Sequence, residues 1–60
     1  MISDKAELWK LFSDKLISAR LHPETYREDF DEEYQKIVTE SPVVQEKIVR
    51  ALAKFALASP

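Results

Sequence analysis

Sixty residues, 45% of them hydrophobic and carrying a net charge of −2, suffice for one small folded domain, which we expect to span residues 1–60. The chain has no Cys, which excludes disulfides and thiolate zinc sites, and a single His cannot build a histidine-rich metal site. A weakly acidic chain has no general attraction to nucleic acid or anionic lipid. We expect a cytoplasmic protein, because the sequence shows neither a signal peptide nor an apolar run long enough to span a membrane.

The first predicted helix covers residues 4–21. Asp4 and Glu7 have the spacing of a capping box, and Ser3 is an alternative N-cap. The helix is expected to stop before Pro23, because a residue that precedes proline is pushed out of the α region. Apolar residues at helical spacing predict one buried face: Leu8, Trp9, Phe12, Leu16 and Ala19.

The second predicted helix covers residues 23–40 and is strongly acidic. Residues 22–41 contain seven acidic and two basic side chains, a local net charge of −5. A break near Asp29 or Asp31 is an open alternative to one continuous helix. A narrow seam predicts its buried side: Tyr26, Phe30, Tyr34 and Ile37. Four of its carboxylates are candidates for contact with a basic protein: Glu28, Asp29, Glu32 and Glu33.

The third predicted helix covers residues 42–58 and begins at the clearest local signal, Ser41 before Pro42. Its polar side chains fall in one narrow sector, and apolar residues cover an arc of roughly 200°, where a surface helix needs only about 100°. Two other helices in so short a chain are expected to leave part of this arc uncovered. The residues assigned to that protein-binding flank are Val49, Ala53, Ala56 and Leu57.

The connections between these helices are short, so consecutive helices are expected to pack as antiparallel neighbours. The chain lacks Gly, and hairpin turns of the Asn-Gly kind are therefore absent. The sequence predicts an all-α, up-down-up three-helix bundle.

The sequence predicts no catalytic set, metal site or cofactor, and we expect a protein that is not an enzyme. Our leading hypothesis is a small helical protein–protein interaction module or regulator. It would self-associate, as a homodimer, through the apolar flank of the third helix, and its acidic second helix would offer a contact for a basic partner. Because the acidic second helix and the basic stripe of the third helix have opposite charge, two copies could pair either head to tail or around a two-fold axis.

A DNA-binding regulator is the alternative. Lys47, Arg50 and Lys54 stand at i, i+3 and i+7, as phosphate contacts do on a recognition helix. Three cations are few, however, and the chain has no Asn and only Gln35 and Gln45 to read adenine. Nucleic acid is therefore the less favoured partner.

Overall fold

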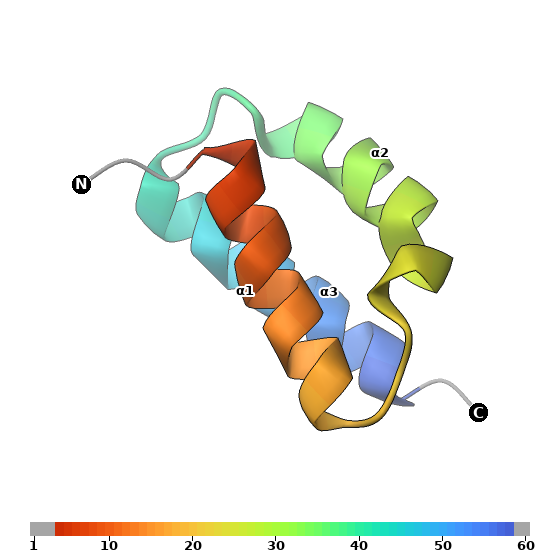
Figure 1. Ribbon diagram of the computed structural model, residues 1–60. Coiled ribbons are helices and arrows are strands. Elements are labelled where there is room, and N and C mark those ends of the chain that lie inside the picture. The colour runs from red at the N-terminus through yellow and green to blue at the C-terminus, as the bar shows by residue number, and fades with distance from the viewer. Residues whose placement is uncertain (1–3, 59–60) are drawn as a thin grey trace.

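The computed structural model describes residues 4–58 and shows three α-helices and one 3-10 turn (Figure 1). In chain order these are α1 (Lys5–Ser18), η1 (Pro23–Tyr26), α2 (Arg27–Ile37) and α3 (Pro42–Ala58). The predicted all-α three-helix bundle is confirmed, and the described part of the chain contains no strand.

Helix α1 begins as predicted and ends three residues early. The Glu7 backbone N–H donates to Asp4 Oδ1 over 2.9 Å, so Asp4 is the N-cap; the alternative cap, Ser3, lies outside the described residues. At the other end Leu21 N–H donates to Leu16 O and Arg20 N–H to Ile17 O, the two bonds of a Schellman turn. Arg20 takes the left-handed conformation (φ 65°) that glycine usually takes, in a chain without glycine.

The predicted continuous second helix, 23–40, is wrong in its bounds. Pro23–Tyr26 forms a 3-10 turn, and its last residue, Tyr26 (φ −107°, ψ 13°), is also the N-cap of α2. The break in the predicted helix therefore falls before Asp29 and Asp31. Short 3-10 turns are common at helix N-termini. Helix α2 ends at Ile37 with Val38 as its C-cap, three residues before the predicted end at residue 40.

Helix α3 has the predicted bounds. The Val44 N–H lies 3.4 Å from Ser41 Oγ and the Gln45 N–H donates to Ser41 O over 2.9 Å, which confirms Ser41 as the cap. None of the described helices is long and apolar enough to cross a membrane.

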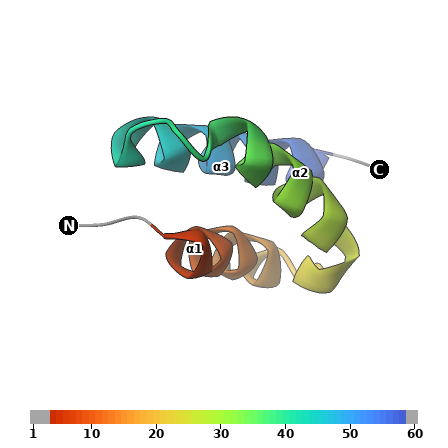
Figure 2. The same ribbon diagram turned by 90° about the horizontal axis from the view of Figure 1, so that it is seen from above.

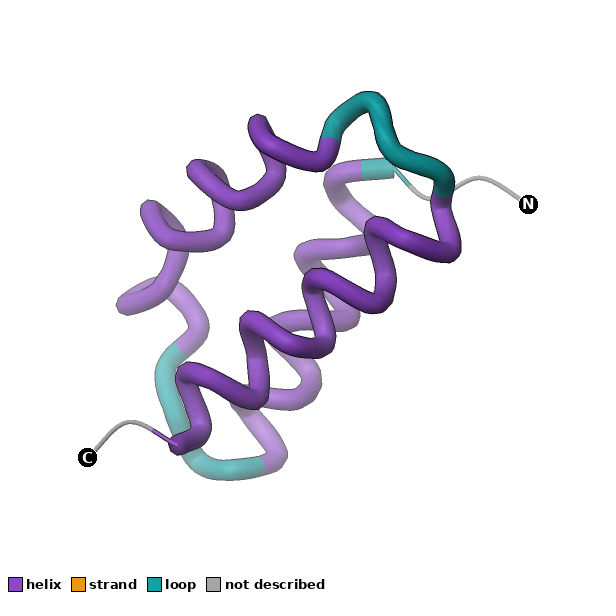
Figure 3. Tube along the Cα trace, turned by 180° about the vertical axis from the view of Figure 1, so that it is seen from behind, coloured by secondary structure: helices purple, strands orange, loops and turns teal. Residues whose placement is uncertain are grey.

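Helices α1 and α3 run in the same direction, and α2 runs back between their ends (Figures 1 and 3). Seen from above, α1 and α3 lie on opposite sides, and α2 runs from the level of α1 at its start to that of α3 at its end (Figure 2). The most extensive helix–helix contact is between α1 and α3, and α2 makes a smaller one with α3. The seam between α1 and α3 is therefore the main packing interface of the fold.

One hydrophobic core lies inside the three helices. Its eight buried side chains, each at most 5% exposed, are Leu8, Phe12, Leu16, Phe30, Ile37, Val49, Ala53 and Ala56. Our expectation that Val49, Ala53 and Ala56 would be exposed for a partner is therefore wrong. These side chains are small, so the large residues of α1 and α2 cover them within one chain. Uncovered apolar side chains lie elsewhere: Ile17, Val38, Val43, Phe55 and Leu57.

Candidate functional site

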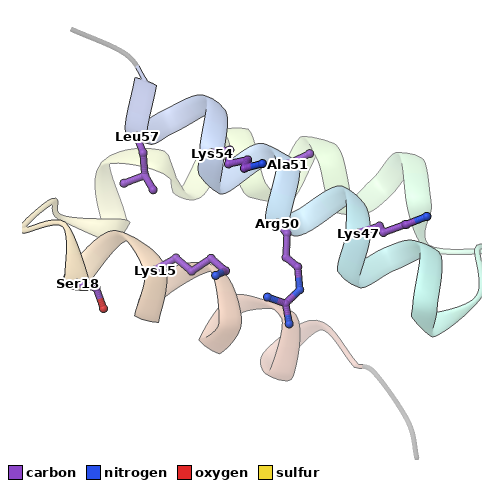
Figure 4. Close-up of a pocket in the computed structure, with 7 residues that line it drawn as sticks. All are labelled: Lys15, Ser18, Lys47, Arg50, Ala51, Lys54 and Leu57. Carbon is purple, nitrogen blue, oxygen red and sulfur yellow. The ribbon is translucent and has the colours of Figure 1, made fainter.

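The basic residues predicted on the third helix lie along a groove between α1 and α3. Lys47, Arg50 and Lys54 are all exposed, and Lys15 of α1 joins them. The groove has a volume of about 580 Å³. Figure 4 shows Arg50 and Leu57 pointing from α3 toward α1, where Lys15 lies. We call this groove the basic groove; its lining is Lys15, Ser18, Lys47, Arg50, Ala51, Lys54 and Leu57.

Positive charge dominates the basic groove. Its four charged side chains, among the described residues, are all cations. Arg50 has a carboxylate partner in Glu46, whose Oε1 lies 4.0 Å from an Arg50 guanidinium nitrogen, with both side chains substantially exposed. An exposed pair at that distance is weak, so Arg50 retains the capacity to bind an external carboxylate or phosphate.

The groove continues toward the start of both helices. A second hollow of about 340 Å³ adjoins the first, and Arg50 lines both. Its charges are mixed and its apolar residues are Leu8 and Leu11 of α1. The two hollows lie along the α1–α3 seam and share Arg50; the first is lined by cations and the second by charges of both signs.

Leu57 is the one member of the predicted apolar flank that the structure leaves at the surface, with 42% of its area exposed. It lines the basic groove, whereas Val49, Ala53 and Ala56 lie in the core. The four residues of the predicted apolar flank therefore do not form one surface, and Leu57 lies beside the cations of the basic groove.

The acidic residues predicted on the second helix lie away from the basic groove. Glu28, Asp29 and Glu32 are exposed, while Glu33 is partly buried and lies 4.0 Å from Lys36 Nζ. Asp29 also borders a small hollow of about 60 Å³ where α3 meets η1 and α2. Apolar and aromatic side chains form the rest of this hollow: Phe12, Tyr26, Leu52, Phe55 and Ala56.

Asp31 has a different environment from the other acidic residues of α2. Its Oδ1 lies 3.1 Å from Lys5 Nζ and 3.2 Å from Arg27 Nε. The hydrogen bond from Lys5, followed by the charges of Arg27 and Lys5, lowers the pKa of Asp31 below its ordinary value of 3.8 in spite of partial desolvation. Because Asp31 ties α2 to the start of α1, we assign it a structural role.

Within residues 4–58 no three His, Asp or Glu side chains gather closely enough to hold a metal ion. No known protein family matches the chain, and neither a curated protein nor a solved structure matches it. The function is therefore inferred from the geometry and charge of the surface.

Sequence reasoning missed Lys15. On α1 the residues Leu8, Leu11, Lys15 and Ser18 follow at intervals of three, four and three, so they share one side of the helix. In an up-down-up bundle the first and third helices are parallel neighbours. Aligning this stripe with the basic stripe of the third helix would have found the groove.

Proposed function

We propose that this chain is a non-enzymatic protein-interaction module that holds an acidic segment of another polypeptide in the basic groove. The observation that carries this proposal is that Lys15 of α1 and Lys47, Arg50 and Lys54 of α3 line one groove, toward which Arg50 and Leu57 point in Figure 4. Carboxylates would pair with the cations, and an apolar side chain would cover Leu57.

The arrangement of the two hollows along the α1–α3 seam supports a helical partner. Parallel α1 and α3 leave a seam on the side where the basic groove continues into the hollow at Leu8 and Leu11. An amphipathic helix laid along such a seam buries apolar residues at i, i+3, i+4 and i+7. A fourth helix would then complete a four-helix arrangement.

The expected complex is sensitive to salt. Exposed ion pairs contribute at most about 1 kcal/mol each and are screened by salt, so the cations would give orientation and association rate more than affinity. Leu57 would supply the apolar anchor that helps to set the lifetime of the complex.

A peptide titration tests the proposal. A fluorescent amphipathic helical peptide rich in Glu is titrated with the protein, beside the same peptide with Gln in place of Glu. We expect Lys15→Glu with Lys54→Glu to weaken binding of the acidic peptide by about tenfold or more, because the groove then carries two carboxylates beside Lys47 and Arg50 and loses its net positive charge. The matched control is Lys36→Glu on α2, whose side chain is 74% exposed and outside the groove. Equal affinity of the acidic and Gln peptides, or of the parent and the double variant, would reject the proposal.

Duplex DNA is the second candidate. The observation in its favour is again Lys15, which raises the number of cations on this face from three to four. Neutralising four phosphates predicts a logarithmic salt slope of about −3.6. An anisotropy titration with a short duplex at low salt tests it, and the absence of binding there would exclude this candidate.

The homodimer and the cytoplasmic location expected from the sequence remain proposals. Three of the four apolar residues assigned to the homodimer interface are buried in the core of the monomer, so any self-association must use a different surface. Fractionation of the source cells with an antibody to the protein would test the location.

A further inference from the structure

A second exposed surface lies on the other side of α3. Phe55 is 74% exposed and borders the hollow that it shares with Tyr26 and Asp29. The exposed carboxylates of Glu28 and Glu32 belong to the same helix as Asp29. We call this surface, formed by Phe55, Glu28, Asp29 and Glu32, the acidic flank.

The acidic flank and the basic groove face different directions. Two residues along an α-helix are separated by about 200° of rotation, so Leu57 and Phe55 point to different sides of α3. Leu57 lies in the basic groove, where α3 faces α1. Phe55 lies where α3 faces η1 and α2.

The two surfaces are complementary in chemistry. The basic groove offers four cations around the partly exposed Leu57. The acidic flank offers the exposed ring of Phe55 near Asp29, and the exposed carboxylates of Glu28 and Glu32 on the same helix as Asp29. Each surface therefore combines an apolar side chain with charges of the sign that the other needs, as complementary interfaces do.

We infer that the acidic segment held in the basic groove is the acidic flank of a second copy of this chain. This inference rests on the proposed function, because it names the partner of the same groove. Phe55 of one copy would cover Leu57 of the next, and Glu28 and Glu32 would face Lys15 and Lys54.

The geometry determines the kind of assembly. A two-fold dimer brings the same surface of both copies to one interface, but here the two complementary surfaces lie on different sides of α3. A head-to-tail contact leaves a free groove at one end and a free flank at the other. Further copies therefore bind at both ends, and the assembly either closes into a ring or grows as a chain. The self-association is thus open-ended and differs from the homodimer expected from the sequence.

Sedimentation velocity over a roughly hundredfold range of protein concentration tests the inference by mass action. At low salt the weight-average mass should rise steadily with concentration. At about 500 mM salt it should fall toward the monomer, because salt screens exposed charges. A chain that stays monomeric at every concentration at low salt overturns the inference. The acidic-peptide titration then decides separately whether the proposed function fails with it.

Charge reversal identifies the contact. A groove variant carries Lys15→Glu and Lys54→Glu and keeps Arg50 beside Glu46; a flank variant carries Glu28→Lys and Glu32→Lys. Each alone should be monomeric, because like charges then meet where Glu28 and Glu32 would face Lys15 and Lys54. An equimolar mixture should associate again, since these charges are opposite in every contact between the two variants. Glu40→Lys, in the exposed turn between α2 and α3 and in neither surface, is the control and should associate like the parent.

Three results would contradict the inference: either variant associating like the parent, the mixture remaining monomeric while the parent associates, or Glu40→Lys abolishing association. Circular dichroism of each variant, with a parent-like helix content, shows that the changes acted on the surface. A mass that stops at two in the parent would also overturn the open-ended arrangement.

Discussion

Helices α1 and α2 are held in the bundle by different means. α1 contributes three fully buried apolar side chains, Leu8, Phe12 and Leu16, and makes the largest helix–helix contact with α3. α2 contributes only two, Phe30 and Ile37, and the rest of its attachment is polar, aromatic or ionic. A helix as acidic as α2 is not held by buried apolar area alone, and polar, aromatic and ionic contacts keep it in place.

The polar attachments of α2 lie at both of its ends. Near the start of α2 the Arg27 guanidinium lies 4.4 Å from the Trp9 ring centroid, and Phe30 lies 5.0 Å from the same ring. At its end the buried Gln45 amide of α3 donates to Ile37 O over 3.0 Å and lies 3.4 Å from Val38 O. This amide satisfies carbonyls that a helix terminus would otherwise leave unpaired.

The largest expected effect comes from Phe12, which both regions share. Its side chain is fully buried, and its ring lies 5.5 Å from Phe30 of α2. Phe12→Ala should cost about 3–5 kcal/mol, much of the stability of so small a domain. Urea unfolding followed by circular dichroism measures it. Phe55→Ala, at an exposed ring, is the control and should change stability by less than about 0.5 kcal/mol; a parent-like transition for Phe12→Ala would refute the core assignment.

The next effect tests how closely the helices approach α3. Ala53 is fully buried, and no space remains for a larger side chain in a well-packed core. Ala53→Leu should destabilise the protein by about 1–3 kcal/mol through overpacking. Ala51→Leu on the exposed side of the same helix is the matched control. Equal transition midpoints for the two variants would show that the core near Ala53 is loosely packed.

A smaller effect tests the polar attachment of α2. Gln45→Met keeps the length of the side chain and removes its amide, leaving the Ile37 and Val38 carbonyls without that donor. The cost should lie in the lower half of roughly 1–3 kcal/mol, because carbonyls at a helix end can partly recover water. Hydrogen exchange should speed up at the end of α2 more than in α1. Gln35→Met, on the exposed side of α2, serves as control; uniform exchange across both helices would argue against a local role for Gln45.

The sequence predicted the apolar faces of the helices well, because periodicity reports which side of a helix is buried. Ala19 is an exception: it was predicted on the buried face of the first helix, but it caps α1 and is exposed. The sequence also predicted Asp4 and Ser41 as caps, since capping depends on residues three positions apart. It failed at Arg20 and Tyr26, where the chain takes a left-handed residue and ends a 3-10 turn that local propensity does not favour.

The candidate site was only half predictable. Lys47, Arg50 and Lys54 share one helix and were found from spacing, but the groove exists only because Lys15 of α1 lies beside them. The burial of Val49, Ala53 and Ala56 was missed for a related reason: a helical wheel shows how wide the apolar arc is, but not how much of it small side chains allow two neighbours to cover.

The smallest expected effect concerns the ionic attachment at Asp31 and appears only in acid. The Lys5 hydrogen bond lowers the pKa of Asp31 in the folded chain, so the folded state binds this proton less tightly than the unfolded state. The resulting stability is therefore fully present above the unfolded pKa, about 3.9, and is lost as the pH falls through the lower folded pKa. An NMR titration of the Asp31 carboxyl should give a midpoint below 3.8, and Lys5→Met should move it upward, while Lys36→Met should not. A midpoint in the parent at the ordinary value, or one that Lys5→Met leaves in place, would show that α2 is held by Trp9, Phe30 and Gln45 without help from this ion pair.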